Sequence, residues 1–186
     1  MVYLPTLVDL TILHHSWWYL EHLAAPRLQT LSLGIANPGG HPHIDHIDRM
    51  GIIFTDSPES WGIRPTIFRL YSALSQTVAC LILERWSQLR HVLLCVGEAH
   101  RESLITTLRA REAVEGGMDA IAGWKACPDL ETLDLEVGSH LDREDHDEWR
   151  GFASVVLFAR RTGRLRQISW GRGSDRRTLT RESVCK

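Results

Sequence analysis

The chain has 186 residues, of which 44% are hydrophobic and 24% are charged, and its formal net charge is -2. This composition is ordinary for a folded protein of about one domain and excludes a chain that is disordered throughout. A charge this close to zero gives no general indication of nucleic-acid binding.

The cysteines Cys80, Cys95, Cys127 and Cys185 stand singly, which indicates neither a zinc ribbon nor a disulfide framework. We therefore expect reduced thiols and an intracellular protein, cytoplasmic or nuclear. The first basic residue is Arg27, so the apolar start of the chain lacks the charged region of a signal peptide. The chain contains no run of about 18 apolar residues, and we expect no membrane-spanning helix.

A short pattern, P-x-L-x-x-L-x-[LI], occurs at residues 5–12, 26–33 and 128–135, and looser copies lie at 78–83, 89–94 and 165–170. The last four residues of each copy alternate, which predicts a strand with two apolar side chains on one face. The first Leu of the pattern is expected to anchor the chain as it enters that strand. Because each unit buries one apolar edge and needs a neighbour to cover it, the repetition predicts a solenoid with irregular spacing.

Helical patterns lie between these copies. We expect helices over 16–23, 65–74, 98–115, 118–125 and 147–162, the third of which precedes Gly116-Gly117 and the last of which precedes Gly163. In the helix over 65–74, Pro65 fits the first position and Ile67, Leu70, Tyr71 and Leu74 share one face. The basic residues after Gly171 predict a flexible tail over 171–186, and residues 1–170 then form a single repeat domain.

Three segments give the chain a more specific resemblance. Residues 23–33 and 127–135 each place a small residue before the Pro-x-Leu of the pattern, and residues 158–168, which lack the Pro, resemble the late repeats of the family named below. Over roughly residues 4–170 the chain resembles the leucine-rich-repeat region of fungal F-box-like proteins. The resemblance implies an irregular α/β solenoid, with parallel strands on the concave face and helices and loops on the convex side.

The same resemblance implies a non-enzymatic protein-recognition scaffold, such as the substrate-binding region of an F-box-type ubiquitin ligase adaptor. The F-box itself is not recognised, since a repeat begins already at Pro5. No residue is therefore assigned to docking on the ligase. The first repeat also has no cap, which predicts an exposed apolar edge through which the chain could self-associate, unless the chain is a truncated form.

The residues that flank the middle Leu of each copy are expected to line the concave face. They are polar and mostly small, which suits a surface for a protein partner that the sequence does not identify; the other interpretation is that they are only solvated strand residues. Cys80, Ile82 and Leu93 fall on the same face but are apolar, so either something covers them or the register there is wrong. The predicted protein-binding residues are Asp9, Thr11, Thr30, Ser32, His91, Thr132, Asp134, Glu136, Gln167 and Ser169.

A histidine cluster supports an alternative function. His41, His43, Asp45 and His46 form H-x-H-x-D-H, which resembles the zinc motif of metallo-β-lactamase-fold hydrolases and implies a metal-activated water as nucleophile. Against this, the cluster follows the turn-forming residues 37–40 rather than a strand, and no distant histidine lies in a matching motif. The leading interpretation therefore assigns no catalytic residue, no metal and no cofactor, and it predicts neither membrane nor nucleic-acid partners.

Overall fold

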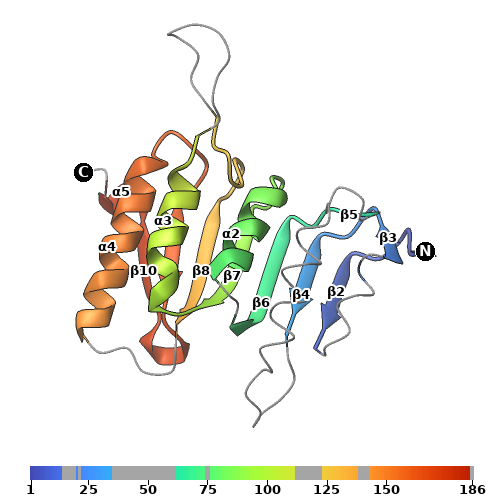
Figure 1. The fold of residues 1–186 in the computed structure, drawn as a ribbon, viewed down its shortest axis with the longest axis horizontal. Helices are drawn as coiled ribbons and strands as arrows, with labels where there is room; N and C mark the ends of the chain where they lie inside the picture. Colours follow the sequence, from blue (N-terminus) through green and yellow to red (C-terminus); the bar gives the residue numbers. More distant parts are fainter. Residues whose placement is uncertain are drawn as a thin grey trace, which may run out of the picture.

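The chain folds into an α/β structure dominated by a mostly parallel sheet of seven strands (Figure 1). The computed structural model describes residues 1–13, 20, 22–34, 62–73, 76–111, 123–137 and 143–184. The strands are β1 (Val2–Tyr3), β2 (Asp9–Ile12), β3 (Leu23–Ala25), β4 (Thr30–Leu33), β5 (Gly62–Ile63), β6 (Ile67–Ala73), β7 (His91–Val96), β8 (Thr132–Val137), β9 (Gln167–Trp170) and β10 (Arg177–Thr180). The helices are α2 (Gln76–Arg85), α3 (Arg101–Arg109), α4 (Arg143–Ala159) and α5 (Arg181–Val184), with 3-10 turns η3 (Glu98–His100) and η4 (Gly173–Asp175).

The large sheet has the strand order β10-β9-β8-β7-β6-β4-β2. Its neighbouring strands are parallel except for β10 and β9, and the parallel strands lie side by side in the order in which they occur in the chain. Strands β1, β3 and β5 form a second parallel sheet of three strands. In both sheets the pairing therefore joins segments that follow one another along the chain.

The L-x-L pattern places two rows of apolar side chains on one face of the large sheet. In register, the first row is Leu10, Leu31, Phe68, Val92, Leu133 and Ile168, and the second is Ile12, Leu33, Leu70, Leu94, Leu135 and Trp170. All of these are buried except the two on β2, which are only partly buried. Burying a leucine contributes about 1.5–3 kcal/mol, so these rows account for much of the stability of the sheet.

The first Leu of the pattern anchors the chain before each strand, as expected. Leu28, Leu89, Leu130 and Leu165 are all buried, whereas Leu7 is only partly covered. Next to these anchor positions, backbone hydrogen bonds also join the segments that lead into neighbouring strands. The Thr132 amide, for example, donates to Arg90 O at 3.1 Å. The repeated sequence pattern therefore corresponds to a repeated structural position.

Two neighbouring predictions were wrong. Residues 65–74 were expected as a helix, but β6 occupies Ile67–Ala73, and the strand expected over 78–83 is part of helix α2. The register shows that Phe68 and Leu70 supply the two inward side chains and that Pro65, which is buried, stands where the other copies have their first Leu. A proline suits this position because it lies just before the strand and needs no hydrogen-bond donor in the sheet.

Helix α2 buries its side chains with a helical period. Ala79, Ile82, Leu83 and Trp86 are 0–2% exposed and follow the spacing i, i+3, i+4, i+7. The predicted placement of Cys80 and Ile82 on the polar face of the sheet fails for this reason. The edge-to-face contact of Trp86 with Phe68, with ring centroids 5.1 Å apart, holds this part of the chain against β6.

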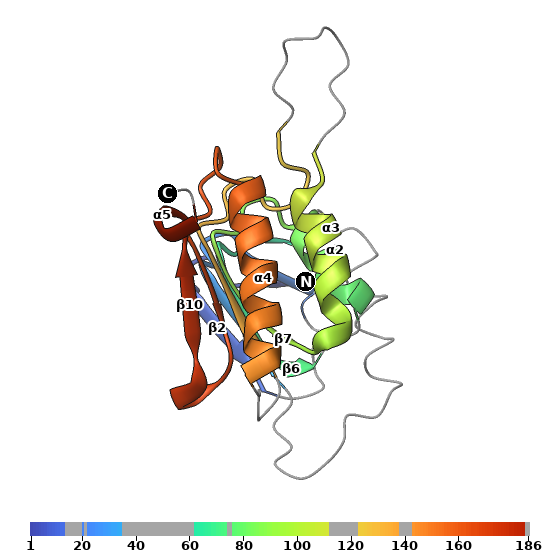
Figure 2. The same cartoon turned by 90° about the vertical axis from the view of Figure 1, so that its left-hand side faces the viewer.

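Helices α2, α3 and α4 lie together on one face of the sheet (Figure 2). The helix expected over 98–115 is confirmed from residue 98 to residue 109, as η3 followed by α3, and the helix expected over 147–162 is α4, which begins and ends a few residues earlier. The helices expected over 16–23 and 118–125 fall mostly outside the described residues; residues 123–125, which are described, are not helical.

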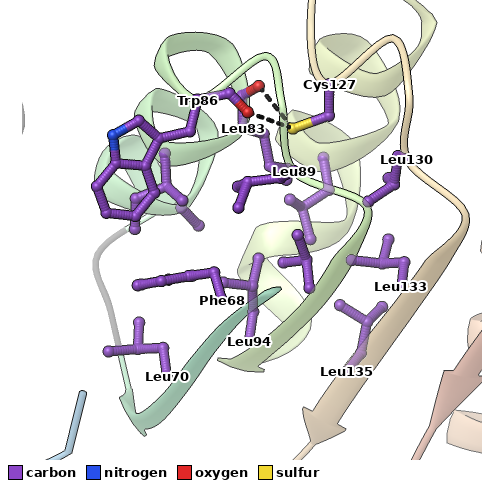
Figure 3. Packing of buried hydrophobic residues seen from close by; sticks show 14 of the residues in the cluster. Phe68, Leu70, Leu83, Trp86, Leu89, Leu94, Cys127, Leu130, Leu133 and Leu135 are labelled. Atoms are coloured by element: carbon purple, nitrogen blue, oxygen red, sulfur yellow. Dashed lines mark hydrogen bonds between the residues drawn. The ribbon is translucent and has the colours of Figure 1, made fainter. Parts of the chain in front are cut away.

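The segment between α3 and β8 is held by one cysteine and one arginine. The Cys127 thiol donates to the carbonyl oxygens of Leu83 at 3.0 Å and Trp86 at 3.4 Å (Figure 3). The Arg160 side chain is 1% exposed and donates from Nη2 to Cys127 O at 2.7 Å. Its Cζ atom lies 5.0 Å from the centroid of the Trp124 ring. Burial lowers the pKa of Arg160 to about 10. Arg160 is therefore a buried donor that ties the C-terminal end of α4 to the chain before β8.

The chain after Gly171, expected from its charge to be a flexible tail, forms η4, β10 and α5 as far as Val184. Strand β10 pairs with β9 along its whole length, from Arg177 opposite Trp170 to Thr180 opposite Gln167. Gly171 and Gly173 allow the turn between the two strands, because both have positive φ angles, of 96° and 56°. This hairpin covers one end of the sheet.

Candidate protein-binding face

The predicted protein-binding residues lie on one face of the large sheet, opposite the helices. One row across the sheet contains Asp9, Thr30, His91, Thr132 and Gln167, and the next contains Thr11, Ser32, Asp134 and Ser169, with Glu136 one step further along β8. Alternation along each strand turns these side chains away from the buried Leu rows. We call this side of the sheet the open face, and it consists of these ten residues together with Ile67, Arg69, Leu93, Cys95, Thr178 and Thr180.

Sequence reasoning missed the part of the open face that comes from β6. Ile67 pairs with Thr30 and His91, and Arg69 pairs with Ser32 and Leu93. A signal for this strand is present in the sequence, because Ile67-Phe68-Arg69-Leu70 alternates like the other strands. The helical spacing of the same segment concealed it.

Side-chain hydrogen bonds connect neighbouring strands across the open face. His91 Nδ1 lies 2.9 Å from Thr132 Oγ1, which joins β7 to β8. Ser169 Oγ lies 3.0 Å from Thr178 Oγ1 and 3.1 Å from Gln167 Nε2, which joins β9 to β10. These polar side chains are held in place rather than only solvated, which gives the face a defined pattern of donors and acceptors.

Charged groups gather on the C-terminal part of the open face. Arg176, from the turn before β10, donates from Nη2 to Asp134 Oδ1 at 2.5 Å. The Cys95 thiol donates to Glu136 Oε2 at 3.2 Å. Burial, together with this acidic neighbour, raises the pKa of Cys95 to about 12. Cys95 is therefore a protonated hydrogen-bond donor at neutral pH and not an activated nucleophile.

A shallow hollow of about 230 Å³ lies at the centre of the open face. Its floor and walls are formed by strands β6, β7 and β8, with the half-buried Ile67 and Leu93 surrounded by Arg69, His91 and Asp134. Apolar groups with a polar rim are the arrangement found at the centre of many protein interfaces. The hollow can therefore accept an apolar side chain while its rim hydrogen-bonds to the groups beside it.

A larger groove of about 550 Å³ lies on the helix side, between α2 and α3. Its lining includes Cys80, Glu84, Glu102 and Thr107. Burial raises the pKa of the Cys80 thiol, which disfavours the thiolate that a nucleophile requires. The groove carries no arrangement of acid, base and nucleophile among these residues, and its volume alone does not indicate chemistry.

The alternative metal site cannot be placed. His41, His43, Asp45 and His46 all lie outside the described residues. Within the described part of the chain, no group of three or more His, Cys, Asp or Glu side chains could hold a metal ion. Of the downstream histidines, His91 bonds with Thr132 on the open face and His100 Nδ1 accepts the Gly97 amide at 3.1 Å.

Comparison with protein-family models, with curated proteins and with solved structures gave no match. Among the described residues, no helix combines the length and the apolar character needed to cross a membrane. The function must therefore be argued from the geometry of the chain itself.

Proposed function

We propose that the protein is a non-enzymatic recognition scaffold that binds a protein partner on the open face of its large sheet. The observation that carries this proposal is the alignment of the polar residues of β2, β4, β7, β8 and β9 in register on the face opposite the helices, where Ser32 and Ser169 are buried and the other eight are partly or fully exposed. A sheet face held by cross-strand hydrogen bonds loses little side-chain freedom on binding, which lowers the entropic cost of association.

The central hollow supports a protein rather than a small molecule as the partner. It is small and shallow, whereas pockets for small ligands usually enclose about 300–1,000 Å³. Leu93 and Ile67 offer one apolar contact point, with Arg69 on one side and, on the other, Asp134, which is already paired with Arg176. A chain segment that places one apolar side chain between polar or charged neighbours fits this arrangement.

The finer architecture that supports this function is a leucine-rich-repeat-like solenoid. The parallel strands follow the order of the chain, and the anchor positions Leu7, Leu28, Pro65, Leu89 and Leu130 recur before successive strands. Both features favour repeated units stacked side by side. The role of a ubiquitin ligase adaptor rests on the sequence resemblance alone and forms the more specific part of the proposal.

The test compares two leucines that are half-buried on opposite sides of the molecule. Leu93 lies in the hollow of the open face and Leu81 lines the groove between α2 and α3. A displayed library of random peptides is selected on the wild-type protein, and the affinities of the enriched peptides are then measured for Leu93→Glu and Leu81→Glu. Thermal unfolding confirms that both variants are folded.

We expect Leu93→Glu to weaken peptide binding by about tenfold or more, as for a central interface residue, and Leu81→Glu to leave it within about twofold. Peptides that lose affinity with Leu81→Glu instead would assign recognition to the helix side and refute the proposal. The adaptor role is tested separately: a cellular partner identified through the open face should have a longer lifetime when Leu93→Glu replaces the wild-type protein.

A further inference from the structure

The two ends of the large sheet differ in how they are closed. At the C-terminal end, β10 pairs with β9 and its exposed residues include Arg177 and Thr178. Strand β10 is an edge strand too and, like β2, contains one charged residue, but it contains none of the exposed large apolar residues of the described chain. At the other end, β2 has a single neighbour, β4, in the described part of the chain.

The free edge of β2 presents backbone groups that need partners. The carbonyl oxygen of Val8 accepts from Thr30 N at 3.1 Å and that of Ile12 accepts from Gly34 N at 2.9 Å. Because alternate residues of a strand point their backbone groups to opposite sides, the amide and carbonyl groups of Asp9 and Thr11 point away from β4. Among the described residues no strand pairs with these groups, so this edge can accept another strand while keeping its hydrogen bonds to β4.

Strands β2 and β3 lie at the same end of the molecule as the N-terminus (Figure 1), and several apolar side chains of residues 2–13 are exposed. Val2, Tyr3 and Leu13 are 58%, 65% and 52% exposed, whereas Leu31, on the neighbouring strand β4, is 0% exposed. Together with Leu4 and Val8, these side chains expose on the order of 500 Å², a little over half of the roughly 800 Å² that each partner of a standard interface buries. The partly buried Leu7, Leu10 and Ile12 at the open end of the core would add to this area.

We propose that two copies of the chain pair through this edge, with β2 of one copy antiparallel to β2 of the other. A two-fold axis near Leu10 or Thr11 satisfies the free backbone groups of both copies and covers the exposed apolar side chains of each with those of the other. In either register Asp9, the one charged residue of β2, faces Thr11 or Leu13 of the second copy and not the second Asp9. A second copy therefore fits this edge in hydrogen bonding, apolar area and charge.

Sedimentation equilibrium of the full chain over a range of concentrations tests the proposal with a matched pair of variants. Thr11→Pro removes the outward amide donor from the free edge but no bond to β4, and Thr11→Val keeps the donor. We expect the wild-type chain and Thr11→Val to dimerise alike, and Thr11→Pro to weaken dimerisation by about tenfold or more. Thermal unfolding of dilute samples checks that Thr11→Pro remains folded.

A second variant acts on side chains alone. Val8→Lys combined with Leu13→Lys places charges on exposed positions and is expected to shift the chain towards the monomer as strongly as Thr11→Pro. A wild-type chain that remains monomeric up to the highest soluble concentration would overturn the proposal. A dimer that neither variant weakens would also overturn it, since the interface would then lie elsewhere.

Discussion

Replacing equivalent leucines at the centre and at the open end of the sheet should give very different losses of stability. Leu133 and Leu10 occupy the same position in the repeated pattern and lie in the same row across the sheet. Leu133 is 0% exposed and is flanked by Val92 and Ile168, whereas Leu10 is partly buried and, among the described residues, is flanked in its row by Leu31 alone. Leu133→Ala and Leu10→Ala remove the same atoms, so a difference between their losses of stability must come from the surroundings of the two leucines.

Truncating a completely buried leucine that has neighbours on both sides leaves a cavity that the structure can close only in part. A leucine-to-alanine change of this kind costs about 2–5 kcal/mol, and for Leu133 we expect about 3–4 kcal/mol. Leu10 loses less transfer free energy and leaves no closed cavity, so we expect about 1–2 kcal/mol. In a chain of this length, each kcal/mol lowers the melting temperature by about 2–4 °C.

Urea unfolding followed by tryptophan fluorescence measures both changes, because Trp86, Trp149 and Trp170 are buried in the fold. The protein is kept dilute so that the proposed dimer would not contribute. Equal m-values for the wild type and both variants are required before the free energies are compared. Repeating the Leu10→Ala measurement at high concentration should increase its cost, because a second copy would then cover this side chain.

Equal losses for Leu10→Ala and Leu133→Ala would refute the reasoning. Such a result would mean that β2 is covered as completely as the central strands within one copy of the chain. A loss below about 1 kcal/mol for Leu133→Ala would contradict its place in the core.

Three further predictions concern single positions. Gly171→Ala should cost about 2–3 kcal/mol, because φ is +96° and a Cβ would lie 2.7 Å from Asp175 O. Gly173→Ala should cost about 1 kcal/mol, because φ is +56° but nothing lies within 4 Å of the added Cβ. Equal losses of stability in thermal unfolding would contradict this. Gly151→Ala should stabilise the protein by about 0.5–1 kcal/mol, since it lies within α4 and a Cβ there meets nothing within 4 Å; a lower melting temperature would contradict this. The pKa of Cys95 is about 12 in the folded chain, whereas that of an ordinary cysteine is near 9. The free energy of unfolding should therefore fall as the pH rises across this interval, and it should fall less in Cys95→Ala. Identical alkaline slopes for the wild type and Cys95→Ala in urea unfolding at each pH would show that this thiol does not contribute.

The open face could be predicted to a large extent because it follows from local alternation. In a strand, residues on either side of a buried leucine must point to the opposite face, whatever the rest of the fold does. Thr132 and Asp134 could be assigned to one face from the spacing of Leu133 and Leu135 alone. Which strands lie next to each other does not follow from that spacing, and only the register brings Asp134 opposite both Leu93 and Ser169.

The helix expected over 65–74 is a strand and the strand expected over 78–83 is part of a helix, which shows where local patterns fail. Ile67, Phe68, Leu70 and Tyr71 fit both a helical and an alternating spacing, and short apolar runs are ambiguous for this reason. Tertiary packing decided between them, since Phe68 and Leu70 complete rows that already run through β4 and β7. Ala79, Ile82 and Leu83 then cover these rows as a helix.

The sequence by itself determined the mixed α/β class, the recurring anchor and strand pattern, and the inward and outward sides of most strands. These features depend on residues close together in the chain, whose geometry is set by backbone periodicity. Only the tertiary structure decided that Arg160 is buried against Cys127, that the basic segment after Gly171 forms one edge of the sheet, and that β2 forms the other edge in the described part of the chain. Each of these depends on contacts between distant segments, and no local pattern records which segments will meet.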